Sequence, residues 1–276
     1  MLAIDHRWQW EEWCDTNRVA RARIPEVKAL AAEAFLAARE SSDVIRRSGA
    51  LLVDLTYGRT AFDTAQSAGA IVGTPAERAG AFPLEWTADF GTALPGHFVK
   101  VLVRHRSDLA PAIVAAQRRQ LRELQQWCAD RKKPFVLEVL VAPAHGEEAG
   151  FDSDGRPRLL AGYITDAYGD GVLPDYWKIE GMPSAAALRL VDDAIREKKG
   201  PRQLILGKGA GMDQVRQWFA SAAGAPTAAG FAIGRTVYFD AAAGWLQGSL
   251  AREEAVARIR ANYQSVIDAW TEVQVI

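Results

Sequence analysis

A lysine stands inside a short strand-like stretch of this 276-residue chain, from Asp175 to Gly181. The stretch is rich in aromatic and β-branched residues and is bounded by proline and glycine, which is typical of a β-strand. Side chains alternate along a strand, so Lys178 shares a face with Tyr176 and Glu180. Burial disfavours the ammonium form of lysine, and a neutral amine forms a Schiff base with a carbonyl. The alternative is a structural lysine that is paired with Glu180.

Other ionisable residues lie inside, or at the end of, apolar strand-like runs. Asp5 ends the first run, Lys100 lies in the fourth and Glu138 in the fifth, and Asp54 and Glu180 are further candidates. If these runs are strands of one barrel, the charges face one another at its mouth, where opposite charges offset each other. Two interpretations stay open at this point. The charges are either an ion-pair network that fills the barrel or an active site.

Glycines and an arginine follow the last two strand-like runs. Gly207 and Gly209 come after the seventh run, and Gly234 and Arg235 after the eighth. Loops at these positions of a barrel often bind phosphate through backbone N–H groups, and a guanidinium adds matching donors. We therefore expect an anion site there. The alternative is that the glycines only make tight turns and that Arg235 pairs with an acid.

The histidine spacing does not favour a metal site. The histidines are His6, His97, His105 and His145, without H-x-H or H-E-x-x-H spacing. A catalytic metal ion in a barrel needs ligands such as imidazoles gathered at the barrel mouth. A nucleophile elbow of the G-x-S-x-G type is also missing from the sequence. We expect no metal and no other cofactor.

Eight apolar runs alternate with helix-like segments, which is typical of a (β/α)8 barrel of about 250 residues. The runs lie at residues 2–5, 50–55, 70–73, 97–103, 134–141, 175–181, 203–206 and 230–234. A doubly wound open sheet is the competitor, but no G-x-G-x-x-G follows the first run. No linker or shift in composition divides the chain, so residues 1–276 are expected to form a single-domain TIM barrel.

The helix-like segments differ in how clearly they can be recognised. The clearest is Arg23 to Arg39, with apolar residues at helical spacing. Helices are also expected over residues 60–68, over 184–199 with Ser184 as the cap, and from residue 241 onward. Residues 144–158 are expected to be a polar loop. Residues 74–96 are rich in Gly, Pro and Thr and carry no interpretable pattern.

Composition excludes several classes of function. Hydrophobic residues make up 49% and charged residues 24% of the chain, and the formal net charge is -1. These values are ordinary for a soluble globular protein and favour neither a nucleic-acid nor a membrane partner.

Cys14 and Cys128 lack CxxC spacing and are expected to be buried and reduced. The start of the chain has no signal-peptide pattern, so the cytoplasm is expected. Trp218 and Trp270 leave the question of a homo-oligomer open.

The sequence resembles a known family along its whole length. The segments that carry the resemblance are Leu2 to Arg7, Val99 to Leu102, Phe135 to Leu140, Trp177 to Glu180 and Gly230 to Arg235. They resemble the tagatose-bisphosphate type of class I aldolase. More closely, the chain resembles the aldolase-like domain of unknown function family 2090, which is often fused behind 5-dehydro-2-deoxygluconokinase in bacterial inositol catabolism. The opening as far as Trp13, Leu52 to Arg59 and Gly234 to Thr236 match that domain.

The resemblance implies a (β/α)8 barrel with a Schiff-base lysine on strand six, which falls on Lys178. It implies partners on strands one, four and five, namely Asp5, Lys100 and Glu138. It places the substrate phosphate near four residues, namely Gly207, Gly209, Gly234 and Arg235. The tagatose type carries a Ser-Ala-Gly turn after strand seven, whereas this chain has Gly-Lys-Gly at residues 207–209. That departure leaves open whether the bound anion is phosphate or sulfonate.

The function implied is a metal-independent class I aldolase. The expected substrate is a phosphorylated keto sugar acid, 5-dehydro-2-deoxygluconate 6-phosphate, cleaved to dihydroxyacetone phosphate and malonate semialdehyde. Glu138 is expected to transfer protons, Lys100 to act on Lys178 by like-charge repulsion, and Asp5 to orient Lys100 or a hydroxyl. The substrate carboxylate needs a further cation, for which Arg7, Arg59 and Arg104 are candidates. The alternatives are an aldolase for another phospho- or sulfo-sugar, and a catalytically silent barrel that binds a sugar phosphate.

Overall fold

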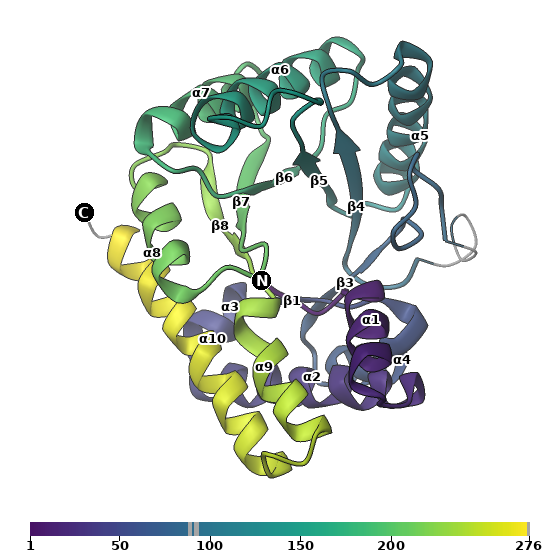
Figure 1. Ribbon diagram of the computed structural model, residues 1–276, viewed down its shortest axis with the longest axis vertical. Helices are drawn as coiled ribbons and strands as arrows, with labels where there is room; N and C mark the ends of the chain where they lie inside the picture. Colours follow the sequence, from purple (N-terminus) through teal and green to yellow (C-terminus); the bar gives the residue numbers. More distant parts are fainter. Residues whose placement is uncertain (88–89, 91–93, 275–276) are drawn as a thin grey trace.

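A computed structural model describes residues 1–87, 90 and 94–274 of the protein. Eight parallel strands lie side by side in the order of the sequence (Figure 1). The strands are β1 (Leu2–Ala3), β2 (Ala50–Leu52), β3 (Ile71–Pro75), β4 (Phe98–His105), β5 (Phe135–Val141), β6 (Tyr176–Glu180), β7 (Arg202–Leu206) and β8 (Ala228–Ala232).

The first and last strands meet, and their contact closes the sheet. Leu2 forms a parallel bridge with Ile233. The N–H of Ala3 donates to the carbonyl oxygen of Ile233 at 3.0 Å, and the N–H of Ile233 donates to that of Met1 at 3.2 Å. The prediction of a (β/α)8 barrel is confirmed, and the doubly wound open sheet is excluded.

Helices cover the outside of the barrel, and the long last helix lies beside the helix before it (Figure 1). The helices are α1 (Trp8–Asn17), α2 (Ile24–Ser41), α3 (Asp43–Ser48), α4 (Leu55–Ser67), α5 (Pro111–Asp130), α6 (Arg156–Gly169), α7 (Ala185–Arg196), α8 (Met212–Ser221), α9 (Arg235–Leu246) and α10 (Arg252–Gln274). A 3-10 turn (Arg21–Arg23) precedes α2, and a π-helical turn (Phe151–Gly155) precedes α6.

The main core lies between the strands and this ring of helices. Trp10 on α1 is fully buried, stacks on Phe239 with ring centroids 4.3 Å apart, and donates its indole N–H to the hydroxyl of Tyr238 at 3.0 Å. Trp177 on β6 is also fully buried and donates to the hydroxyl of Tyr168 at 3.0 Å. The outward face of β6 thus packs through Trp177 against α6, which carries Tyr168.

Capping residues explain where several helices begin. The side chain of Asp54 accepts from the N–H of Tyr57 at 2.9 Å, so α4 begins at Leu55 and not at Thr60. Ser184 caps α7 as predicted, through the N–H of Ala187. The helix expected from residue 241 begins earlier, at Arg235, directly after β8. The loop predicted over residues 144–158 is shorter, because a π-helical turn and the start of α6 occupy its last part.

A hairpin-like excursion follows β3, in the region where the sequence showed no pattern. Glu77 and Trp86 form an antiparallel bridge. The N–H of Arg78 donates to the carbonyl oxygen of Glu85 at 2.8 Å, and the N–H of Thr87 donates to that of Ala76 at 2.9 Å. This excursion, residues 76–87, is called the β3 hairpin below.

Cys14 on α1 and Cys128 on α5 are free and buried, as predicted from their helical, tryptophan-flanked positions. Burial raises the pKa of both thiols, and that of Cys128 reaches about 12. In the described part of the chain, no helix is both long and apolar enough to cross a membrane.

Candidate active site

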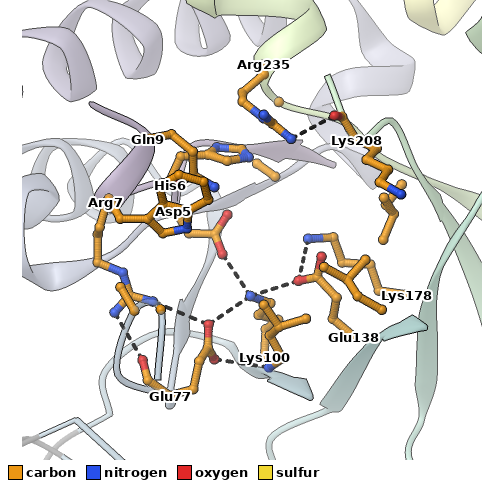
Figure 2. A pocket seen from close by; sticks show the side chains of 18 of the residues that line it. Asp5, His6, Arg7, Gln9, Glu77, Lys100, Glu138, Lys178, Lys208 and Arg235 are labelled. Atoms are coloured by element: carbon orange, nitrogen blue, oxygen red, sulfur yellow. Dashed lines mark hydrogen bonds and ion pairs between the residues drawn. The ribbon is translucent and has the colours of Figure 1, made fainter. Parts of the chain in front are cut away.

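A cavity of about 210 Å³ opens at the mouth of the barrel, where the strands end. Its lining comes from the inward-facing ends of β1, β4, β5 and β6, from the β3 hairpin, and from the loops after β7 and β8. Figure 2 shows acidic and basic side chains from these elements converging on one another. In barrels of this type the chemistry takes place at this end.

Lys178 lies inside the cavity and is 5% exposed. Its Nζ donates to Oε2 of Glu138 at 2.8 Å. The contact follows from the sheet register, which places Glu138 on β5 directly beside Lys178 on β6. Glu180 is not the partner of Lys178, because its carboxylate contacts Arg156 at 3.3 Å and Lys208 at 2.5 Å.

Lys100 lies beside this pair and contacts three carboxylates. Its Nζ is 3.0 Å from Oδ2 of Asp5, 2.9 Å from Oε1 of Glu77 and 2.8 Å from Oε2 of Glu138. Burial alone would lower the pKa of Lys100, but the three carboxylates outweigh it and raise that pKa well above its usual value. Lys100 is therefore a fixed ammonium group. Lys178 and Lys100 both contact Oε2 of Glu138. A proton that moves onto this carboxylate therefore removes the negative charge beside both lysines.

Glu77 is a site residue that sequence reasoning missed. It is 5% exposed and stands at the start of the β3 hairpin. Besides its contact with Lys100, its Oε2 accepts from the backbone N–H of Leu102 at 3.2 Å. Its Oε1 accepts a hydrogen bond from Nη2 of Arg7 at 3.3 Å, and its carbonyl oxygen accepts one from Nη1 of Arg7 at 3.0 Å. Glu77 thus fixes Arg7 and Lys100 together.

The charges in this buried cluster balance. Arg7, Lys100 and Lys178 are the cations, and Asp5, Glu77 and Glu138 are the anions. All six side chains are less than a tenth exposed. Such a cluster avoids an uncompensated buried charge, which would be costly.

Lys100 and Lys178 also lower the pKa values of two carboxyl groups, those of Asp5 and Glu138. Burial would raise the pKa of Asp5 and of Glu138, but Lys100 and Lys178 outweigh it and hold both pKa values below their usual range. Both groups are therefore carboxylates at neutral pH. Next to Lys178, Glu138 is a base that becomes stronger as soon as that lysine gives up its charge.

His6 lines the cavity next to Asp5. Its Nδ1 is 3.3 Å from the hydroxyl of Tyr238. Burial lowers the pKa of His6 to about 3, against the opposing effect of Asp5. The imidazole is therefore neutral at neutral pH, and the cavity gains no charge from it.

A second buried ion pair lies behind the cavity and holds β1 in place. Lys28 on α2 and Asp54 before α4 are fully buried, with Nζ and Oδ2 2.8 Å apart. Lys28 also donates to the carbonyl oxygens of Ile4 and His6, which flank Asp5 in the sequence. Asp54 was a predicted candidate for the mouth, but the structure places it here and outside the cavity lining.

The four residues predicted to bind an anion lie on the other side of the cavity. All of them line it, namely Gly207, Gly209, Gly234 and Arg235. Arg235 is the first residue of α9, and its Nη2 donates to the carbonyl oxygen of Lys208 at 2.7 Å. Gly209 has a φ of +82°, and a Cβ there would lie 3.1 Å from Cζ of Arg235. A Cβ on Gly234 would lie 1.9 Å from the carbonyl oxygen of Ala3. Glycine is therefore required at both positions.

The remaining predicted arginines are placed differently. Arg7 lines the cavity, but its guanidinium is held by Glu77. Arg59 is exposed on α4 and does not line the cavity, whereas Arg104 at the end of β4 does. Within residues 1–87, 90 and 94–274, no group of three or more His, Cys, Asp or Glu residues is arranged to hold a metal ion.

Solved structures with the same fold include several aldolases. The fructose-bisphosphate aldolase from Plasmodium falciparum, in complex with TRAP and an inhibitor, superposes with a TM-score of 0.69 at 13% identity, covering 99% of this chain and 89% of that one. A Schiff-base-forming fructose-1,6-bisphosphate aldolase gives 0.53 at 15% identity, covering 89% and 85%. An archaeal fructose 1,6-bisphosphate aldolase gives 0.50 at 14% identity, covering 78% and 77%. At these identities the likeness shows the barrel fold alone.

The sequence itself has no match among curated proteins. One family model matches residues 1–274, and its description is "Uncharacterized protein conserved in bacteria (DUF2090)". This family is the domain family 2090 that the sequence resembles. Because the match spans almost the whole chain, the protein belongs to this bacterial family.

Proposed function

We propose that the protein is a class I aldolase that cleaves a phosphorylated keto sugar acid through a Schiff base on Lys178. The observation that carries the proposal is the buried contact of Lys178 with Glu138 at the mouth of the barrel. The aldolase-like fold supports it, since one of the similar structures is a Schiff-base-forming aldolase. The substrate that fits the resemblance is 5-dehydro-2-deoxygluconate 6-phosphate. The relation to tagatose-bisphosphate aldolases and to a kinase of inositol catabolism belongs to the same proposal.

The first step is the formation of the Schiff base. Glu138 takes a proton from the Lys178 ammonium, and the free amine attacks the substrate ketone to give a carbinolamine. The protonated Glu138 then donates that proton to the departing hydroxyl, which leaves as water and gives the iminium. Because Lys100 stays charged beside Glu138, the carboxylate form of Glu138 is restored easily.

The second step breaks the carbon–carbon bond. Glu138 accepts the proton of the hydroxyl that becomes the aldehyde, and the electrons of the breaking bond flow into the iminium. The products are malonate semialdehyde and an enamine on Lys178. Protonation of the enamine carbon and hydrolysis then release dihydroxyacetone phosphate and restore the lysine. Arg235 and the backbone around Gly209 are the proposed partners of the phosphate.

The test is borohydride reduction in the presence of dihydroxyacetone phosphate, followed by intact-mass measurement and peptide mapping. A mass increase that maps to Lys178 is expected, because borohydride reduces an iminium to a stable amine. Lys178→Met should give no adduct and lower cleavage at least a thousandfold while keeping the circular dichroism of the parent. A folded parent protein without an adduct would contradict the covalent mechanism and favour a silent sugar-phosphate-binding barrel. A panel of phospho- and sulfo-sugars then identifies the substrate.

We also propose a small-molecule sugar phosphate as the ligand and no nucleic acid or membrane as a partner. The cytoplasm is the proposed compartment, in keeping with the two free cysteines. The oligomeric state stays open.

A further inference from the structure

The basic side chains that line the cavity differ in whether a carboxylate neutralises them. Five of them have a carboxylate within 4.0 Å, namely Arg7, Arg78, Lys100, Lys178 and Lys208. Within the described residues, the other two contact main-chain oxygens instead. Nη1 of Arg104 donates to the carbonyl oxygen of Gly80 at 3.4 Å, and Arg235 donates to that of Lys208. The cavity thus presents two guanidinium groups that form no ion pair with a carboxylate of the described residues.

These two guanidinium groups lie on opposite sides of the barrel. Arg104 is the next-to-last residue of β4, and Arg235 begins α9 three residues after the end of β8. In a closed barrel of eight strands in sequence order, β4 and β8 are four positions apart, which is diametrically opposite (Figure 1). Lys178 lies on β6, midway between them. A ligand that spans the cavity therefore meets a cation at each end and the amine of Lys178 in its middle.

Strand alternation explains why Arg104 points into the cavity. Lys100, Leu102 and Arg104 occupy every second position of β4, and all three line the cavity. Lys100 lies deepest and is neutralised by three carboxylates, whereas Arg104 lies at the outer end of the strand. Its contact with Gly80 is long and uses one of its donors, which leaves most of the guanidinium fork for a ligand.

We propose that Arg104 is a specificity-determining residue, which binds the carboxylate at the end of the substrate that is remote from the phosphate. This inference rests on the proposed function and deepens it. It assigns the preferred ligand class as a linear molecule with an anionic group at each end and the reacting carbon between them. A guanidinium suits this task because its planar fork matches the two oxygens of a carboxylate.

The two competing arginines do not fit this role. The guanidinium of Arg7 is buried and already engaged by the side chain and the carbonyl oxygen of Glu77. Releasing it would leave Glu77 with one cation fewer in a buried cluster whose charges balance. Arg59 is exposed on α4, outside the cavity lining. Of the three candidates that the sequence offered, Arg104 alone both lines the cavity and has no carboxylate of the described residues as an ion-pair partner.

The inference can be tested by binding alone, without turnover. The probes are 6-phosphogluconate and sorbitol 6-phosphate, which share a six-carbon chain and a phosphate and differ in the carboxylate. Isothermal titration calorimetry on the full-length protein gives both affinities. The parent is expected to prefer 6-phosphogluconate by about 10- to 100-fold, the size of a charged hydrogen-bonded contact. Arg104→Met should reduce that preference to about twofold or less, and Arg104→Lys should keep part of it.

A matched control separates a local contact from a change in net charge. Arg59→Met removes the same charge outside the cavity and is expected to keep the parental preference. Equal affinities for the two probes in the parent, or an unchanged preference in Arg104→Met, would overturn the inference. Failure of the proposed chemistry has a separate signature, which is the absence of a borohydride adduct with dihydroxyacetone phosphate. That ketone has no carboxylate, so its result does not depend on the role assigned to Arg104.

Discussion

At the scale of single residues, the proposed chemistry depends on the carboxylate oxygen shared by Lys100 and Lys178. Both amino groups lie 2.8 Å from Oε2 of Glu138. The sequence suggested that Lys100 acts on Lys178 by repulsion. In the structure the charge of Lys100 is offset by three carboxylates, which weakens that repulsion. We infer instead that Lys100 acts through Glu138, whose pKa it lowers.

Replacing Glu138 by glutamine tests this role. Glutamine keeps the shape and accepts hydrogen bonds from both lysines, but it cannot take up a proton. We expect the rate of cleavage to fall by about 10²- to 10⁴-fold, which is the usual contribution of a general acid–base. Steady-state kinetics and the rate of borohydride-trapped adduct formation measure the effect. The exposed Glu148→Gln serves as the control, and a parental rate in Glu138→Gln would show that another group moves the proton.

At the scale of elements, β1 is held in place by a residue from outside the barrel wall. β1 has two residues, and Asp5 follows it. Lys28 on α2 donates to the carbonyl oxygens on both sides of Asp5 and pairs with Asp54. Asp54 in turn caps α4. This chain of contacts links two outer helices to the carboxylate that contacts Lys100.

Replacing Lys28 by methionine should therefore be costly. It leaves the carboxylate of Asp54 buried without a cation beside it, and we expect the free energy of unfolding to fall by about 3–5 kcal/mol. Urea denaturation measures this change. Adding Asp54→Asn removes the orphaned charge while keeping an oxygen to cap α4, so the double variant should lose less than the sum of the two single losses. Additive losses would show that the two residues do not act as a pair.

The elements also show what the sequence could reveal. The eight strands were predictable because strands buried on both faces are short apolar runs, and the charges in them stood out against that background. Glu77 did not stand out, because its segment of Gly, Pro and Thr has no periodicity. Its signal was an acid just after a strand, the same signal that marked Asp5. The sequence signal for Lys28 was a charged residue beside Val27 and Ala31, on the apolar side of a clearly predicted helix.

Other features depend on contacts between distant segments, which the sequence does not display. The partner of Lys178 is set by the register between β5 and β6, and the sequence allowed Glu180 equally. The three candidate arginines could not be ranked, because the predicted fourth strand ended at Val103. The structure extends this strand to His105, which places Arg104 on the inward face.

At the scale of the whole molecule, the pH dependence of stability follows from buried groups. His6 and His105 have pKa values lowered by burial, and that of His6 falls to about 3. Between the ordinary value of 6.5 and the lowered one, the unfolded chain binds the proton and the folded chain does not. Stability is therefore lost as the pH falls below 6.5. The lowered pKa values of Asp5 and Glu138 add a further loss at lower pH, below the ordinary carboxyl values.

The contribution of His6 can be isolated above the carboxyl range. Between pH 6.5 and 4.5, one histidine changes the free energy of unfolding by at most about 1.4 kcal/mol per pH unit. His6→Asn should reduce the slope by up to that amount, since asparagine does not titrate. Urea denaturation at several pH values gives the slopes. His145→Asn, which removes an exposed imidazole, is the matched control, and an unchanged slope in His6→Asn would show that the folded protein accepts the proton at His6.

The two buried thiols have a practical consequence for experiments on the mouth of the barrel. Cys14 and Cys128 are fully covered, and burial keeps them as thiols and not as the reactive thiolate. Maleimide and iodoacetamide reagents need the thiolate, so the native protein gives them no ready target. A cysteine placed at Ala81, where the β3 hairpin lines the cavity, can therefore carry a fluorophore without removal of either native cysteine. Such a label would report the arrival of a ligand beside Arg104 in the otherwise unaltered protein.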